Sequence, residues 1–184
     1  MTPTGVVLAG GASRRMGSDK AVIDVDGVPM ASRVAAALAA GGCDPVVCQG
    51  GDSDSIAPLG LAVFPDSNPG AGPLPAILDA LARETGDVVV CACDLPWLEG
   101  AKIARLLGVA NRDPAADVVV ASDASGPHLA AVWRPHARQV LADLVAVGVR
   151  SYRAALEGLH TVRVDVPSAV LTNVNNPEDL GRHR

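Results

Sequence analysis

The chain has 184 residues, enough for one domain with a sizeable core and too few to suggest two. Its formal net charge of −5 argues against a basic surface that follows nucleic acid. No apolar run is long enough to span a membrane, and no charged segment precedes the first apolar run, as a signal peptide requires. We therefore expect one cytoplasmic domain, residues 1–184, that binds neither nucleic acid nor membrane.

Short β-branched runs alternate with Ala- and Leu-rich segments. Near-continuous apolar runs are typical of strands buried on both faces, and strand–helix alternation is typical of right-handed βαβ units. The predicted strands are 5–9, 45–49, 61–65, 87–93, 117–121, 129–133 and 160–164. The predicted helices are 30–40, 73–84, 100–111, 135–147, 151–159 and 177–182. The pattern predicts an α/β fold, a three-layer αβα sandwich around a Rossmann-like, mostly parallel sheet.

The four cysteines are Cys43, Cys48, Cys91 and Cys93. They form no C-x-x-C pair, and no histidine stands at ligand spacing from them. Two of them lie in VVVCACD, which has the pattern of a buried strand. We expect all four to be reduced and to act as small hydrophobic residues.

The first predicted strand runs into GGASRRMGSDK, which has the ingredients of a phosphate loop. The glycines at 10, 11 and 17 do not have the spacing of the G-x-G-x-x-G dinucleotide motif. They do not fit the G-x-x-x-x-G-K-[ST] loop either, because Gly11 and Gly17 are one residue too far apart. Even so, Gly10 and Gly11 let backbone N–H groups approach an anion closely. Arg15 can bind two phosphate oxygens and Lys20 supplies a compact charge. The alternative is a glycine turn with a solvated basic cluster.

Two aspartates follow predicted strands, where ligands bind in such sheets. Asp94 ends the apolar run VVVCACD and is a candidate Mg²⁺ ligand, since this ion takes only one or two protein carboxylates beside substrate phosphates. Its alternative role is the N-cap of the next helix. Asp66 follows the third strand, and an Asx turn with Ser67 and Asn68 is its alternative. No Ser–His–Asp or Cys–His set stands out around the histidines, so covalent catalysis is not indicated.

Four motifs resemble the signatures of one known family, in the same order. LAGGASRRMGSDK at 8–20 resembles L-A-G-G-x-S-x-R-M-G-x-D-K, and PDSNPGAGPL at 65–74 resembles a segment ending in D-x-x-x-x-x-G-P-L. CACDLPWL at 91–98 resembles C-x-x-D-x-P-[FY]-[LI], and NVNNPEDL at 173–180 resembles N-[IV]-N-[TS]-P-E-[DE]-L. The chain is thus similar to the molybdenum cofactor guanylyltransferases (MobA family), which implies a fold of the nucleotide-diphospho-sugar transferase type.

The resemblance also implies roles for individual residues. The implied nucleotide contacts are Leu8, Ala9, Gly10, Gly11, Lys20, Asp66, Gly72, Pro73, Leu74 and Asp94. The implied catalytic residues are Arg15, Lys20 and Asp94, with Mg²⁺ on Asp94. The implied molybdopterin contacts are Arg150, Asn173 and Asn175. Two segments depart from the pattern: Gln49 stands where the family commonly has Asn, and GVRS at 148–151 replaces a G-E-[RK]-[KR] segment.

The implied reaction transfers GMP from GTP to the terminal phosphate of molybdopterin or Mo-molybdopterin, and pyrophosphate leaves. A phosphomonoester is already nucleophilic near neutral pH, so the reaction needs no general base. The implied partners are these two substrates, with molybdoenzyme apoproteins or delivery chaperones as further partners. Three alternatives remain open: cytidylyl transfer from CTP, another small nucleotidyltransferase, and a non-catalytic protein that binds and delivers the cofactor.

Overall fold

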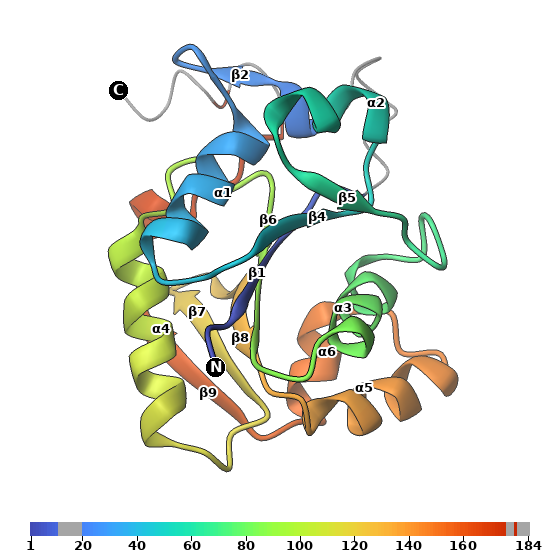
Figure 1. The fold of residues 1–184 in the computed structure, drawn as a ribbon. Helices are drawn as coiled ribbons and strands as arrows, with labels where there is room; N and C mark the ends of the chain where they lie inside the picture. Colours follow the sequence, from blue (N-terminus) through green and yellow to red (C-terminus); the bar gives the residue numbers. More distant parts are fainter. Residues whose placement is uncertain (11–19, 176–178, 180–184) are drawn as a thin grey trace.

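The structure is a computed structural model that describes residues 1–10, 20–175 and 179. The strands of its main sheet are β1 (Thr4–Leu8), β4 (Val46–Gln49), β5 (Ala62–Phe64), β6 (Val88–Ala92), β7 (Val118–Asp123), β8 (Gly126–Trp133) and β9 (Thr161–Asp165). All seven predicted strands are present, in the order β5-β4-β1-β6-β8-β7-β9 (Figure 1). β8 runs antiparallel to β6 and β7, and the other neighbouring pairs are parallel. The mostly parallel sheet is therefore confirmed, with one reversed strand.

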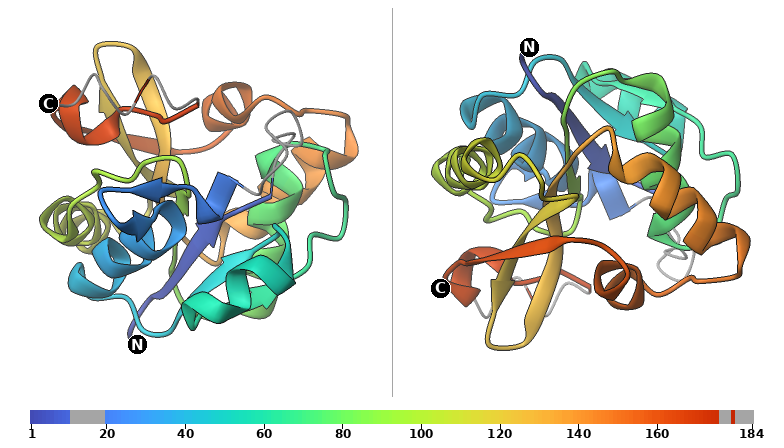
Figure 2. Two further views of the ribbon diagram at one scale, coloured as in Figure 1. Left: turned by 90° about the horizontal axis from the view of Figure 1, so that it is seen from above. Right: turned by 90° about the horizontal axis from the view of Figure 1, so that it is seen from below.

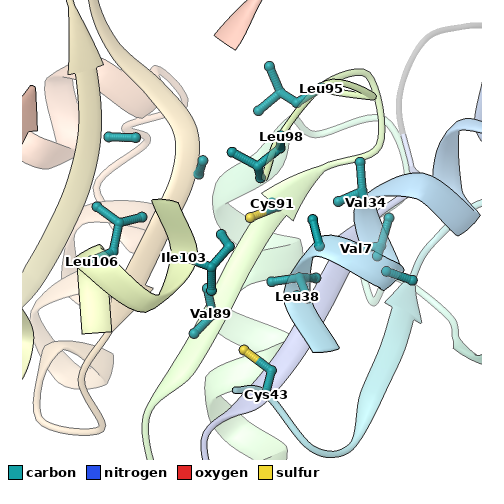
Figure 3. Packing of buried hydrophobic residues seen from close by; sticks show 14 of the residues in the cluster. Val7, Val34, Leu38, Cys43, Val89, Cys91, Leu95, Leu98, Ile103 and Leu106 are labelled. Atoms are coloured by element: carbon teal, nitrogen blue, oxygen red, sulfur yellow. The ribbon is translucent and has the colours of Figure 1, made fainter. Parts of the chain in front are cut away.

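Helices cover both faces of the sheet, which confirms the three-layer arrangement (Figures 1 and 2). The helices are α1 (Met30–Ala40), α3 (Pro73–Arg83), α4 (Gly100–Arg112), α5 (Ala137–Ala146) and α6 (Tyr152–Glu157). Side chains of α1 and α4 pack on one face, against residues such as Val7 and Cys91 (Figure 3). Side chains of α3, α5 and α6 pack on the other face, against residues such as Val6 and Val88. Neighbouring strand residues thus serve opposite layers, as the two-residue period of a strand requires.

The four cysteines are buried and form no disulfide, as expected. Cys43 and Cys91 belong to the layer under α1 and α4 (Figure 3). Burial raises the pKa of the Cys43 thiol to about 12, which keeps it protonated at neutral pH. Within the described ranges, no helix is both long and apolar enough to cross a membrane.

Several short elements were not predicted. A hairpin of β2 (Asp24–Val25) and β3 (Val28–Pro29) turns at Asp26 and Gly27, whose φ angles are 52° and 83°. An Asp-Gly pair between two short apolar runs is a strong hairpin signal, but the predicted strands do not include this hairpin. The others are α2 (Ser53–Ile56), which begins after Asp52, and the 3₁₀ turns η2 (Lys20–Val22), η3 (Ala57–Leu59) and η4 (Ser168–Leu171). The predicted helix 177–182 lies outside the described residues except for Asp179.

The sheet has one edge at which β1, β4, β5, β6 and β7 all end, hereafter the carboxyl edge. β7 shares the direction of β6 because both are antiparallel to β8. The loops after Leu8, Gln49, Phe64, Ala92 and Asp123 therefore leave the sheet on the same side. In open α/β sheets this is the side on which ligands bind.

Candidate active site

A lysine–aspartate pair lies at the centre of the carboxyl edge. Asp94 follows β6, and its Oδ2 lies 2.7 Å from the Nζ of Lys20, at the start of η2. The two side chains are only 11% and 18% exposed, so the ion pair is largely shielded from water. Helix α4 begins later, with Glu99 at its N-cap. Asp94 therefore does not cap that helix, and this alternative role is wrong.

The segment that follows η4 completes this pair. Asn175 Oδ1 accepts a second hydrogen bond from Lys20 Nζ, at 2.9 Å. Asn173 Nδ2 donates to Asp94 Oδ1 at 3.1 Å, and the backbone N–H of Val174 donates to the Asp94 carbonyl at 2.9 Å. Val174 is buried in a small cluster with Val25 and Met30. The two asparagines expected on the molybdopterin side thus contact Asp94 and Lys20, and their contact with a pterin stays a prediction.

The arrangement of oxygen atoms around Lys20 fits a hard cation. The ammonium group lies between a carboxylate oxygen of Asp94 and an amide oxygen of Asn175, and so acts as a stand-in cation. Carboxylate and amide oxygens are the ligands that Mg²⁺ and similar ions prefer, and one or two protein ligands suffice when phosphates supply the rest. Asp94 and Asn175 are therefore the residues that could hold a divalent metal.

A second carboxylate lies beside two glycines at the same edge. Asp66 Oδ2 is so close to the backbone after β1 and β4 that a Cβ on Gly10 would lie 2.3 Å from it, and one on Gly50 would lie 2.5 Å away. Asp66 Oδ1 accepts a hydrogen bond from Gln49 Nε2 at 3.1 Å. The partner of this carboxylate thus comes from the neighbouring strand. Ala9 N and Gly10 N both bond to the Gln49 carbonyl, which holds the first residues of the glycine loop against β4.

The remaining predicted contacts are spread around this core. Gly72 precedes α3 with a φ of 89°, Pro73 is the first residue of that helix, and Leu74 is buried. Arg150 donates through Nη1 to the carbonyls of Val145 and Val149, at 2.9 and 3.0 Å. Its own carbonyl lies beside Gly72, 3.6 Å from the position of a Cβ there. Leu8 is buried at the end of β1. Gly11 and Arg15 lie outside the described residues.

The turn between β7 and β8 holds a serine, a histidine and an aspartate that do not form a catalytic triad. Asp123 Oδ1 accepts from Ser125 Oγ at 2.7 Å and from Ser125 N at 2.8 Å, and lies 3.0 Å from His128 Nε2. These hydrogen bonds, first that of the Ser125 hydroxyl and then that of His128, hold the pKa of Asp123 well below its usual range. Ser125 Oγ also lies 3.3 Å from His128 Nε2, but Asp123 meets that same ring nitrogen, whereas in a catalytic triad the serine and the aspartate bond to opposite nitrogens of the histidine.

A shielded Lys–Asp pair and a second carboxylate beside Gly10, at the carboxyl edge of an α/β sheet, fit a nucleotidyltransferase. Known proteins agree with this class. Residues 5–162 match the MobA-like NTP transferase domain, and the chain belongs to this family.

Relatives and solved structures support the assignment over nearly the full length. A probable molybdenum cofactor guanylyltransferase of Mycobacterium marinum is 37% identical over 183 residues, which cover 96% of this chain and 90% of the relative. Molybdopterin-guanine dinucleotide biosynthesis protein A of Archaeoglobus fulgidus has the same fold, with a TM-score of 0.78 at 23% identity over 98% of this chain and 96% of that one. A Mycobacterium tuberculosis protein solved in complex with manganese has a TM-score of 0.73 at 19% identity. The match covers 100% of this chain and 98% of that one.

Proposed function

We propose that this nucleotidyltransferase transfers GMP from GTP to the terminal phosphate of molybdopterin, and so forms molybdopterin guanine dinucleotide. The observation that carries the proposal is the Lys20–Asp94–Asn175 group. Asp94 follows β6, and Gly10, against which Asp66 lies, follows the neighbouring strand β1. Asp94, proposed to bind the cation, and Asp66, proposed to contact the nucleoside, thus lie on one edge of the sheet. The name of the 37% identical relative supplies the two substrates.

In the proposed reaction, an oxygen of the acceptor phosphate forms a bond to the α-phosphorus of GTP. The bond from that phosphorus to the bridging oxygen breaks, and pyrophosphate leaves with the electron pair. The acceptor is an anion already, so no residue has to remove a proton from it. Catalysis then depends on alignment and on neutralising negative charge.

Different residues of this chain would neutralise charge, hold the metal and position the substrates. Lys20 contributes a positive charge for the phosphates once it leaves Asp94, and Arg15 is proposed to contribute a second. Asp94 and Asn175 would hold Mg²⁺, which neutralises charge on the phosphate oxygens. Gly10, Gly11, Asp66 and the turn before α3 (Gly72, Pro73 and Leu74) would position the nucleoside, together with Leu8 and Ala9. Arg150, Asn173 and Asn175 are proposed to meet the acceptor.

The compartment of the reaction and the proteins that receive its product are further parts of the proposed function. We infer that residues 1–184 work as one domain in the cytoplasm, and that molybdoenzyme apoproteins or delivery chaperones receive the product. None of these points is needed for the chemistry, which can be tested with the purified chain alone.

The test is to incubate the purified chain with GTP, Mg²⁺ and molybdopterin, and to measure pyrophosphate and the dinucleotide. We expect both products in equal amounts. Asp94→Ala lowers the rate by roughly a hundredfold or more, because the charge of the transition state loses its main support. Glu99→Ala, five residues along the same loop and exposed, is the matched control. Binding of both ligands without pyrophosphate release would overturn the proposal in favour of a delivery protein.

A further inference from the structure

Gln49 is a buried polar side chain with an unusual position. It is the last residue of β4, between Leu8 of β1 and Phe64 of β5, and it is 0% exposed. It shares a sheet face with Val47, which packs in the layer under α3. A buried amide at the end of an otherwise apolar strand lowers stability unless its polar atoms are hydrogen-bonded.

The amide nitrogen of Gln49 is fully used. Nε2 donates to the Pro65 carbonyl at 2.9 Å and to Asp66 Oδ1 at 3.1 Å. Both neighbours are acceptors only, so the nitrogen end of the amide must face them. One side chain thus fixes both the backbone before Asp66 and the carboxylate of Asp66 itself.

The amide oxygen of Gln49 is buried and has no hydrogen-bond partner among the described residues. A buried acceptor without a donor costs about 1–3 kcal/mol. An apolar side chain of the same shape would avoid this cost. It would also leave the Pro65 carbonyl and Asp66 Oδ1 without their donor, so what this glutamine supplies beyond an apolar residue is its hold on the segment that carries Asp66.

The carboxylate that Gln49 holds lies directly against two glycines. Asp66 Oδ2 sits against the Cα positions of Gly10 and Gly50, where any Cβ would collide with it. Gly50 also has a φ of 71°, which favours glycine. Asp66 Oδ2 is thus presented at the carboxyl edge as a directed acceptor, beside the start of the glycine loop.

We propose that Gln49 is a positioning residue for the nucleotide: its amide nitrogen directs Asp66 so that Oδ2 accepts a hydrogen bond from the nucleoside. The donor is either the 2-amino group of guanine or a hydroxyl of the ribose, since both are neutral donors that a carboxylate binds well. This inference rests on the proposed function, and it assigns to Gln49 an indirect role through Asp66.

The test measures GTP binding by calorimetry, with no turnover required. Gln49→Met keeps the length of the side chain but removes both donors, and we expect it to weaken GTP binding about tenfold. Asp66→Ala weakens binding by a similar factor. The double variant binds no more weakly than Asp66→Ala, because Gln49 acts through that carboxylate. Gln139→Met is the matched control: this glutamine is exposed on α5 and bonds to Asp143.

Nucleotide analogues identify the donor. If the tenfold loss in Gln49→Met disappears with ITP, which lacks the 2-amino group, the base donates to Asp66. If it disappears with 2′-deoxy- or 3′-deoxy-GTP, the sugar donates. A loss shared equally by all analogues overturns the hydrogen bond, and additive losses in the double variant overturn the action through Asp66.

Thermal unfolding separates positioning from a structural role. Gln49→Met removes an unsatisfied buried acceptor and also the donor to the Pro65 carbonyl and Asp66; because these two effects on stability oppose each other, its melting temperature stays within a few degrees of wild type while binding falls. Gln49→Leu, which also lacks the amide, gives the same weakening and is the variant to use if Gln49→Met does not fold. If wild type binds no GTP, the proposed function fails. If wild type and Gln49→Met bind equally well, only this inference fails.

Discussion

At the scale of single residues, Lys20 and a divalent metal compete for the same oxygen atoms. Lys20 Nζ occupies Asp94 Oδ2 and Asn175 Oδ1, the two atoms that a metal would need. We therefore expect a metal that binds these two oxygens to displace Lys20 from Asp94. A released lysine is then available to the phosphates, which links metal binding to the placement of the positive charge.

This competition predicts opposite effects from one substitution. Lys20→Met should bind Mn²⁺ about tenfold more tightly in the absence of nucleotide, because the competing ammonium group is gone. The same variant should transfer GMP much more slowly, because the phosphates lose a positive charge. Metal binding is measured by calorimetry or electron paramagnetic resonance. Lys102→Met is the control: Lys102 lies on α4 and pairs with Glu99, the N-cap of that helix. Weaker Mn²⁺ binding in Lys20→Met would contradict the competition.

At the scale of elements, one arginine of α1 connects the parts that surround Asp94. Arg33 donates through Nη1 to the Val25 carbonyl in β2 at 2.9 Å, and through Nε to the Pro96 carbonyl after β6 at 3.0 Å. The β2–β3 hairpin and the loop that carries Asp94 are therefore fastened to the same helix. That helix in turn packs on the sheet through Val34 and Leu38 (Figure 3).

We expect Arg33→Met to keep the apolar stem and to lose both hydrogen bonds. Two carbonyls would lose a charged donor, which lowers the free energy of unfolding by about 1–3 kcal/mol in urea denaturation. Arg105→Met, on the exposed side of α4, should change it by less than about 0.5 kcal/mol. Equal effects of the two substitutions would show that Arg33 does not fasten these elements.

The β7–β8 hairpin carries a stability term that depends on pH. Hydrogen bonds from Ser125 and His128 hold the pKa of Asp123 below its usual value, so the folded state favours the charged carboxylate. The resulting stability is fully present above the unfolded pKa of about 3.9 and is lost as pH falls toward the folded pKa. Wild type should exceed Asp123→Asn in free energy of unfolding at pH 5. That margin should shrink below about pH 4 in urea titrations. A margin that stays constant at pH 3 would contradict this.

The strands were predictable because each contains an apolar run. In β6, for example, Val88 to Cys91 are all buried, so both faces of the strand are covered. Their order was not, since a βαβ pattern fixes the handedness of a connection but leaves open which strands become neighbours. The reversal of β8 follows from the two-residue connection after Asp123, a local feature that the apolar pattern does not record.

The candidate site divides in the same way. Asp94, Lys20 and Asp66 were found because charged residues directly after apolar strands are conspicuous. The contacts of Lys20 with Asp94 and Asn175 join positions 74 and 155 residues apart, which no spacing rule supplies. Gln49 appeared in the sequence only as a departure from a family pattern. Its hold on Asp66 depends on the pairing of β4 with β5, which needs the tertiary structure.

At the scale of the whole molecule, the main proposed contacts among the described residues lie on the carboxyl edge of one sheet. β5, β4 and β1 carry the Asp66 side, and β6 carries Asp94. The segment after η4 returns from beyond β9 to bond with Asp94 and Lys20, so Asn173 and Asn175 reach this edge, whereas the N-terminus lies at the far end of β1 (Figure 2). A ligand that bridges the edge therefore contacts segments from most of the fold, and its binding should stabilise the molecule as a unit.

This coupling predicts a nucleotide-selective thermal shift. A ligand at about 100 times its dissociation constant adds about 2.7 kcal/mol to the stability of the folded state. For a chain of this length that corresponds to roughly 5–10 °C in melting temperature. We expect GTP with Mg²⁺ to give a shift of this size by scanning fluorimetry, and CTP with Mg²⁺ to give a much smaller one at the same concentration. The shift with GTP should fall in Asp66→Ala, which removes the acceptor proposed for the nucleoside. A larger shift with CTP would identify cytidylyl transfer, because the site would then favour the smaller base at the same phosphates.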